Sequence, residues 1–335
     1  MNGNLREQLL ILPDYFQGHL LLTLISLSIG ILISVPLGVW AIQSPRIKRP
    51  LLATISIIQT FPSVAILALV VALLGGQIGV LPAVIALVLY SILPIARNTV
   101  TGLDTIPLEI VEAARGIGMS PLQILINVRL PLALPIIIAG IRTAAVWTVG
   151  LATLSTLVGA TSFGNYIFTG LQTRNLVAVT VGSVAAATLA VILDTLIAGV
   201  QWLVENRNQS IDLVKYKRVR NALAVGFLLG VGFSVSSIAP RSEPDFVVGG
   251  KGFTEQYIIA GLIAAELEEA GFNVEQRLGL GTEIVYSATL NNTVDVYLEY
   301  TGTVWANRMK NSENPGRDFV MEGVVSHVEG VDGMV

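Results

Sequence analysis

A few residues of this chain have types and spacing suited to chemistry, and that chemistry is binding. Arg142 and Asp194 are charged residues inside long apolar runs, where ionisable groups usually pair or mark a functional site. Lys251 and the turn at 300–303 each follow a predicted strand. The chain has no cysteine and two histidines, which excludes thiolate chemistry and a histidine-rich metal site. It also has no Gly-rich loop ending in Lys-Ser/Thr, so we expect no ATP hydrolysis on this chain and no cofactor.

The two intramembrane charges are expected to neutralise each other. An isolated charge within the apolar part of a bilayer is costly, and pairing is a common remedy. We therefore predict that Arg142 and Asp194 meet across two helices. The alternative is that each side chain reaches a membrane interface alone, since both lie within reach of a helix end.

The elements that must position these residues are mainly membrane helices. Hydrophobic residues make up 53% of the 335 residues and charged residues only 13%, about half the share usual in soluble proteins. A helix needs roughly 20 apolar residues to cross a bilayer. Six runs meet or approach this length: 18–42, 51–74, 80–98, 131–154, 177–203 and 221–239. Prolines near residue 131 favour a kink in the fourth run, and a buried helix is the alternative for the short, glycine-rich sixth.

Basic residues predict the orientation, because Lys and Arg favour the cytoplasmic side. They concentrate after the first, third and fifth runs, so we expect the N-terminus outside and, after six spans, residue 240 outside as well. The sequence thus predicts a transmembrane domain over 1–210. A cytoplasmic basic linker with the sixth helix follows over 211–240, and an extracytoplasmic domain over 241–335. The net charge of −3 gives no reason to expect a nucleic-acid partner.

A polar segment of about 30 residues joins the third and fourth runs, and such a long connection is usually functional. Glu109 to Ala114 is predicted to be helical, and Gly118 fits a helix end or a close backbone approach. Ser120-Pro121 predicts the start of a second short helix. We expect a compact knob on the cytoplasmic side. It carries the ordered pattern Glu112-Ala113-Ala114, Gly118, Val128, Leu130-Pro131.

This pattern resembles the Glu-Ala-Ala loop of ABC importer permeases at every position. The stretches 59–63, 93–99 and 139–144 are also similar to permeases of glycine betaine, choline and carnitine importers. The resemblance covers about 18–205 and implies an all-α polytopic membrane domain in the inner membrane. It further implies a second permease subunit, as a homodimer, and a separate ATP-binding cassette ATPase. The residues implied to form the ATPase-docking loop are Glu112, Ala113, Ala114, Gly118, Leu130 and Pro131.

Beyond residue 240 the composition becomes that of a soluble α/β domain. The expected order is strand 245–250, helix 255–270, strand 273–280, helix 282–291 and strand 293–299. Thr254 is expected to cap the first of these helices. Alternating strands and helices predict a parallel sheet, whose ligands bind at the carboxyl ends of the strands. Lys251 and the turn at 300–303 both fall at that edge.

Three stretches, 250–256, 278–281 and 299–303, resemble the substrate-binding proteins of the same betaine importers. The resemblance implies the first lobe of a periplasmic-binding-protein-like domain, with the second lobe absent from 241–335. It makes Tyr300 one wall of an aromatic box for a quaternary ammonium, while Lys251 and Thr303 hold the solute carboxylate. An aromatic ring stabilises such a cation by roughly 0.5–2 kcal/mol. Gln256 is a further candidate for substrate binding.

Structural roles remain open for the same residues. The alternatives are a packed strand-end aromatic for Tyr300, a solvated loop lysine for Lys251, a helix cap for Thr303 and a first-turn helical residue for Gln256. Tyr286 and Tyr297 are expected to be structural.

The function predicted for the whole chain is a permease subunit that moves a small zwitterionic or quaternary ammonium solute across the lipid bilayer. One alternative is a permease for another amino-acid-like solute. The other is a membrane sensor that binds solute and signals, although the sequence has no visible cytoplasmic signalling domain.

Overall fold

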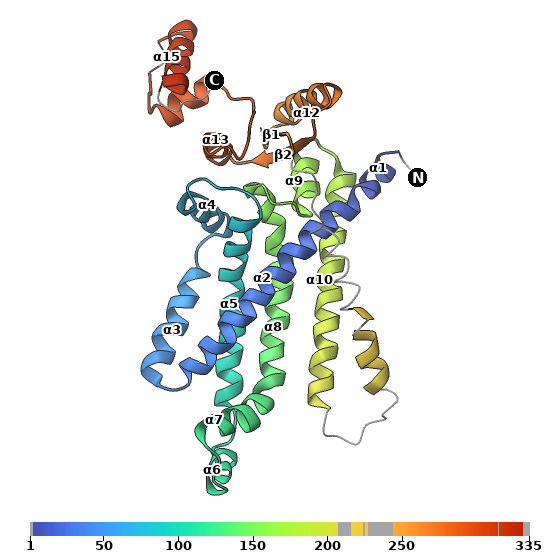
Figure 1. Ribbon diagram of the computed structural model, residues 1–335, viewed down its shortest axis with the longest axis vertical. Coiled ribbons are helices and arrows are strands. Elements are labelled where there is room, and N and C mark those ends of the chain that lie inside the picture. The colour runs from blue at the N-terminus through green and yellow to red at the C-terminus, as the bar shows by residue number, and fades with distance from the viewer. Residues whose placement is uncertain (1–2, 207–215, 224, 227–243, 314, 331–335) are drawn as a thin grey trace.

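The computed structural model describes residues 3–206, 216–223, 225–226, 244–313 and 315–330. A bundle of long helices carries a small α/β unit at one end and a pair of short helices at the other (Figure 1). The bundle and its short helices comprise α1 (Gly3–Leu10), α2 (Leu12–Ala41), α3 (Pro45–Ile58), α4 (Ser63–Leu73), α5 (Val80–Asp104), α6 (Leu108–Gly116), α7 (Pro121–Ile124), α8 (Leu130–Ala152), α9 (Gly164–Gln172) and α10 (Leu176–Glu205).

Residues 244–330 form the α/β unit, which we call the lobe. Its elements are β1 (Phe246–Lys251), α12 (Thr254–Glu269), β2 (Val274–Leu280), α13 (Thr282–Leu290), α14 (Thr301–Thr303), the π-helical turn η3 (Val304–Arg308) and α15 (Arg317–Gly330). α15 packs against η3 and α13 through Val320 and Val324.

Four described helical segments are long and apolar enough to cross a membrane: Leu12–Ala41, Val80–Asp104, Pro121–Val158 and Leu176–Glu205. They contain or largely cover the predicted runs 18–42, 80–98, 131–154 and 177–203. The segment Pro121–Val158 contains a π-helical turn, η1 (Leu125–Arg129), just before the fourth predicted run, and ends in the 3-10 turn η2 (Thr153–Val158). Most of the sixth run, 224 and 227–239, lies outside the described residues.

The prediction of one continuous helix over 51–74 is wrong. α3 and α4 meet at 95°. Pro62 explains the break, because proline has no N–H for a helical hydrogen bond and disfavours helical geometry in the residue before it. The corner is held by Tyr90 of α5, whose carbonyl accepts from Gln59 Nε2 at 3.0 Å and whose hydroxyl donates to Phe61 O at 2.6 Å.

α5 is the central helix, since α2, α3, α4 and α8 all contact it. Two glycines of α2 allow a close approach. A Cβ added to Gly30 would lie 2.1 Å from Ser91 Oγ, and one added to Gly38 would lie 2.6 Å from Thr99 Cβ. Small residues at such contacts are typical of membrane helices, which associate largely through van der Waals packing.

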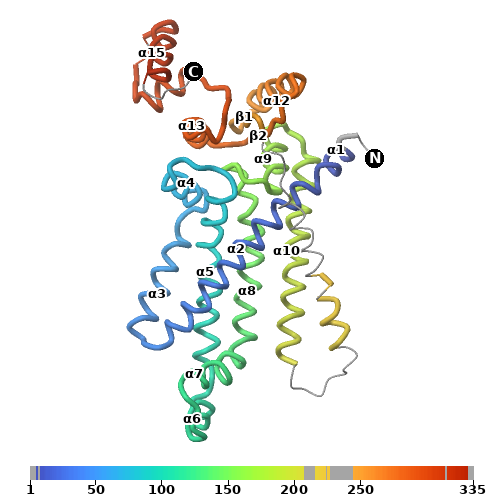
Figure 2. Tube along the Cα trace, in the orientation of Figure 1, coloured from blue at the N-terminus to red at the C-terminus, as the bar shows by residue number. Residues whose placement is uncertain are grey.

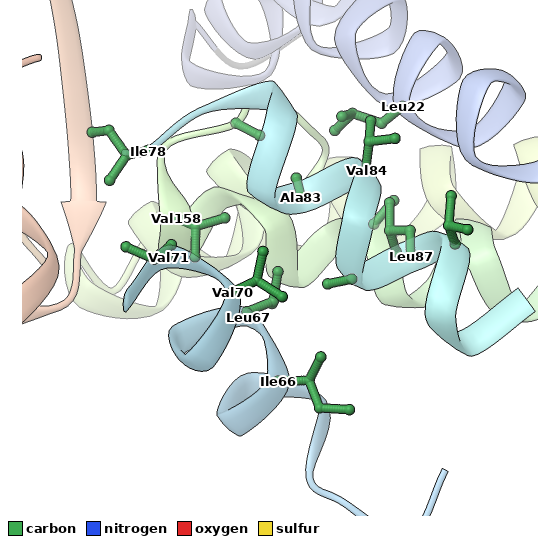
Figure 3. Packing of buried hydrophobic residues seen from close by; sticks show 14 of the residues in the cluster. Leu22, Ile66, Leu67, Val70, Val71, Ile78, Ala83, Val84, Leu87 and Val158 are labelled. Atoms are coloured by element: carbon green, nitrogen blue, oxygen red, sulfur yellow. The ribbon is translucent and has the colours of Figure 1, made fainter. Parts of the chain in front are cut away.

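One apolar cluster joins the bundle to the lobe. At the lobe end of the bundle, α4 packs against the first turns of α5, with Ile78 and Val158 beside them (Figure 3). The same cluster continues into the lobe through Val247, Leu280, Val285, Ala288 and Val294. The two parts therefore share a core at this end of the molecule.

The lobe contains a parallel sheet, as predicted, but with two regular strands instead of three. β1 pairs with β2 in the register Phe246↔Val274, which becomes irregular between Gly249 and Lys251. The predicted strand 293–299 contributes only the isolated bridge Val248↔Val296. Asp295 accounts for the interruption, because its carboxylate accepts the Val247 N–H at 2.6 Å, in place of the backbone carbonyl of a regular ladder.

Thr254 does not cap α12, contrary to the prediction. The helix begins at Thr254 itself, and the threonine hydroxyl donates to Gln172 O, at the end of α9, at 2.8 Å. On another side of the lobe, the Asn291 amide donates to Gly75 O. The threonine thus serves a contact between lobe and bundle, which local sequence cannot reveal.

Candidate functional site

α6 and α7 form the predicted knob, at the end of the bundle opposite to the lobe (Figure 2). Gly118 lies between them with φ +85°, and the space beside it is open, so the turn is what requires glycine. Ser120 starts α7 with a capping box. Its hydroxyl accepts the Gln123 N–H at 3.3 Å, and Gln123 Oε1 accepts the Ser120 N–H at 2.8 Å.

The motif residues divide between the surface and the interior of this region. Ala114 is buried with Val111 and Ile124 in a small core that holds the knob together. Leu130 begins α8 and packs into the bundle. The exposed motif residues are Glu112, Ala113, Gly118 and Pro131.

The knob also exposes large apolar side chains that the motif does not include. Ile117 is 79% exposed, Leu122 64% and Leu108 61%. Several large apolar side chains exposed in one short segment favour an interaction site. The signal in the sequence was the presence of bulky aliphatic residues in an otherwise polar connection.

The structure brings Arg142 of α8 and Asp194 of α10 together in a two-pronged ion pair. Arg142 Nε and Nη2 each donate to one carboxylate oxygen at 2.9 Å. Arg142 Nη1 donates to Gln201 at 3.2 Å, and Gln201 in turn donates to Glu205 at 2.9 Å. We call these four residues the polar ladder. The side chains of the ion pair are 33% and 36% exposed.

Lys251 is the last residue of β1, and it is buried, at 1% exposure, so the solvated-lysine alternative is wrong. Its ammonium pairs with Glu299 and lies 5.5 Å from the ring centre of Tyr300 and 5.9 Å from that of Tyr297. Glu299 also accepts from the Tyr297 hydroxyl at 2.9 Å and the Tyr300 N–H at 2.7 Å. A cation, a carboxylate and two aromatic rings thus meet at the predicted edge of the sheet.

The Gln256 side chain links the end of β1 to the segment that precedes Glu299. Its side-chain oxygen accepts the Lys251 N–H at 3.3 Å, and its side-chain nitrogen donates to Leu298 O at 3.0 Å. The amide is buried, and these contacts give it a structural role at the site. Tyr300 is held in place as well, since its hydroxyl donates to Glu255 at 2.9 Å.

Thr303 lies one turn beyond Tyr300, to whose carbonyl its N–H donates at 2.9 Å. Its side chain makes no capping hydrogen bond to the following π-helical turn, so the cap alternative for Thr303 is wrong. Thr303 and Glu299 line the same small cavity.

Tyr297 was expected to be structural and Glu299 was not a candidate, yet both lie beside Lys251. Both line a cavity of about 470 Å³. Burial, and then the negative charge of Glu299, raise the pKa of the Tyr297 hydroxyl, which keeps it a proton donor. The available signal was an acidic residue next to Tyr300, at the end of an apolar stretch.

A membrane bundle with an exposed knob at one end and a binding-type lobe at the other is the architecture of a transport permease joined to a solute-binding part. The family comparison agrees with this class. The chain belongs to the binding-protein-dependent transport system inner membrane components, whose family model matches residues 30–209. The model of the substrate-binding domain of ABC-type glycine betaine transport systems matches residues 244–333. The chain is therefore a multi-pass inner-membrane permease component, which favours transport over the sensor alternative.

Individual relatives cover different parts of the chain. It is 33% identical over 293 residues to the ergothioneine transport permease/ergothioneine binding protein EgtU of Helicobacter pylori (strain G27). That match covers 84% of this chain and 52% of the relative, so the chain spans about half the relative's length. It is 41% identical over 180 residues to the choline transport system permease protein OpuBB of Bacillus subtilis (strain 168), which covers 54% of this chain and 82% of the relative.

A solved structure shares the fold of the membrane part. An inward-facing form of the MetNI methionine ABC transporter aligns with a TM-score of 0.55 and 23% identity, over 61% of this chain and 99% of the other.

Proposed function

We propose that the chain is the permease subunit of an ATP-driven importer for small zwitterionic or quaternary ammonium solutes. The observation that carries this proposal is the meeting of Lys251, Glu299, Tyr297 and Tyr300 in a lobe that packs on the permease bundle. Relatives named for choline and ergothioneine support the same solute class.

The two charges of a zwitterion could each replace one partner of the Lys251–Glu299 pair. A solute carboxylate would replace Glu299 as the partner of the Lys251 ammonium. The solute cation would lie against Glu299 and the faces of Tyr297 and Tyr300, because a quaternary ammonium cannot donate hydrogen bonds and binds aromatic faces. Every charge has an opposite partner before and after this exchange, so the buried charges are never left alone.

The knob would dock on a separate ATP-binding cassette ATPase, with a second copy of the permease beside it. Glu112 and the exposed side chains of Ile117 and Leu122 provide the charged and apolar parts of the contact. The knob lies opposite to the lobe (Figure 1), which supports a cytoplasmic knob and an extracytoplasmic lobe. ATP-driven closure of the docked subunits would then move the bundle between outward-open and inward-open forms.

A permease for another amino-acid-like solute is the second candidate, because the Lys251–Glu299 pair could recognise the two charges of any α-amino acid. The rings of Tyr297 and Tyr300 favour the quaternary ammonium. A panel of labelled glycine betaine, choline and methionine separates the two.

The test is uptake of this panel by cells that express the chain with its ATPase. We expect import of glycine betaine or choline and no import of methionine. Glu112→Lys should reduce uptake about tenfold or more at unchanged membrane levels, because a charge reversal at an interface is strongly unfavourable. Glu268→Lys, an exposed charge reversal on α12 of the lobe, is the control and should change uptake little. Import of methionine alone would contradict the solute class, and equal effects of the two variants would contradict the docking site.

A further inference from the structure

The ion pair of the polar ladder lies near the middle of the membrane-spanning region. About 17 Å of helix separates Asp194 from Glu205 at the end of α10, and a similar length separates Arg142 from the start of α8. A bilayer core is about 30 Å thick, which puts the ion pair near mid-depth.

The ion pair is open at this depth, with about a third of each side chain exposed. A charge facing lipid at the centre of a bilayer costs about 2.5–3.5 kcal/mol or more, and charges within spans almost always face a bundle interior or a water-filled cavity. We therefore expect the open side of the pair to face water or another polar group when the protein is in a membrane.

The ladder continues from the ion pair toward the knob end of α10. Gln201 lies two turns beyond Asp194, and Glu205 one turn further, on the same face of a mainly apolar helix. Glu205 is exposed. The ion pair alone is enough to hold two helices together. A row of polar groups from mid-depth to the helix end is better suited to the passage of a polar solute.

We propose that the polar ladder is a transit site for the zwitterionic solute inside the permease, a proposal that rests on the function proposed above. The solute carboxylate binds the planar fork of the Arg142 guanidinium, which matches a carboxylate in two-pronged geometry. The solute cation lies against Asp194. Because the solute replaces an existing ion pair, its binding is weak, as passage requires.

Charge selectivity tests this site. Choline carries only a positive charge, whereas glycine betaine carries both. Arg142→Gln leaves Asp194 alone and should raise the ratio of choline uptake to betaine uptake by about fivefold, the effect of one unit charge at contact distance in water. Asp194→Asn leaves Arg142 alone and should lower the ratio by a similar factor. Neither change should alter the affinity of the lobe for either solute.

Matched variants separate this role from a structural one. Thr195→Ala removes an exposed hydroxyl that bonds only to Val191 O of its own helix, so it should leave the ratio unchanged. The double variant Arg142→Gln/Asp194→Asn keeps hydrogen bonding between α8 and α10, and it should fold but transport slowly. Normal uptake by the double variant, or equal loss of both solutes in the single variants, would overturn the transit site. A wild-type chain that imports neither solute would contradict the proposed function instead, and the site with it.

Discussion

Two ion pairs, one in the lobe and one in the bundle, join a cation to a carboxylate with very different degrees of enclosure. Lys251 is 1% exposed and its partner Glu299 16%. Arg142 and Asp194 are 33% and 36% exposed. The lobe surrounds its pair with two tyrosine rings and two further donors to Glu299, whereas the bundle leaves one side of its pair open. A closed pair suits selective capture of a solute, and an open pair suits release.

The largest difference should appear when the cation of the lobe pair is removed. Lys251→Met leaves the carboxylate of Glu299 without its main partner, and breaking a buried pair in this way costs about 3–5 kcal/mol. We expect the free energy of unfolding of the lobe to fall by this amount, measured by hydrogen exchange at β1 in the full-length chain. Adding Glu299→Gln should restore most of it. A double variant as unstable as the single one would show that the pair is not enclosed as described.

The bundle pair should respond less, because its open side allows the remaining charge to find other partners. Arg142→Asp places two carboxylates together and should lower stability by about 2 kcal/mol, less than removal of one partner from a fully buried pair. The exchanged pair, Arg142→Asp with Asp194→Arg, should recover part of the loss. Thermal unfolding in detergent measures both. If the double exchange is no better than either single change, Arg142 and Asp194 do not stabilise each other.

The smallest effect should come from one donor of the lobe site. Tyr297→Phe keeps the ring but removes the hydroxyl that donates to Glu299, a hydrogen bond to a charged group worth about 1.5 kcal/mol. Hydrogen exchange at β1 should rise slightly, and affinity for a quaternary ammonium should hold because the ring remains. Tyr300→Phe is the control, since its hydroxyl bonds Glu255 instead of Glu299. If Tyr297→Phe raised hydrogen exchange at β1 as much as Lys251→Met, the Tyr297 hydroxyl would stabilise Glu299 as much as the Lys251 ammonium does.

The elements that the sequence predicts well are those set by local chemistry. Gly118 and the Ser120-Pro121 start of α7 define the knob because a positive φ and a capping box depend only on neighbouring residues. The meeting of Arg142 and Asp194 follows from the cost of a lone intramembrane charge. The knob needs no knowledge of how distant segments pack. The ion pair joins residues 52 apart in the chain, and it was predictable only because each intramembrane charge needs an opposite partner.

The predictions that failed depend instead on how distant segments of the chain pack. The run 51–74 has the length and hydropathy of one span, and Pro62 was the only sign of the 95° corner. Thr254 has the type of a helix cap, but its hydroxyl bonds Gln172, 82 residues earlier in the chain. Glu299 became part of the site only because folding brings it to Lys251, 48 residues away. Contacts of this kind depend on the tertiary fold.

The contacts between lobe and bundle have a further consequence, because both belong to one polypeptide. The Thr254 hydroxyl, the Asn291 amide and the apolar cluster around Leu280 hold the lobe on the bundle without a second molecule. A tether of this kind raises the effective concentration of one partner near the other into the millimolar range. The attachment can therefore be individually weak and still be occupied most of the time.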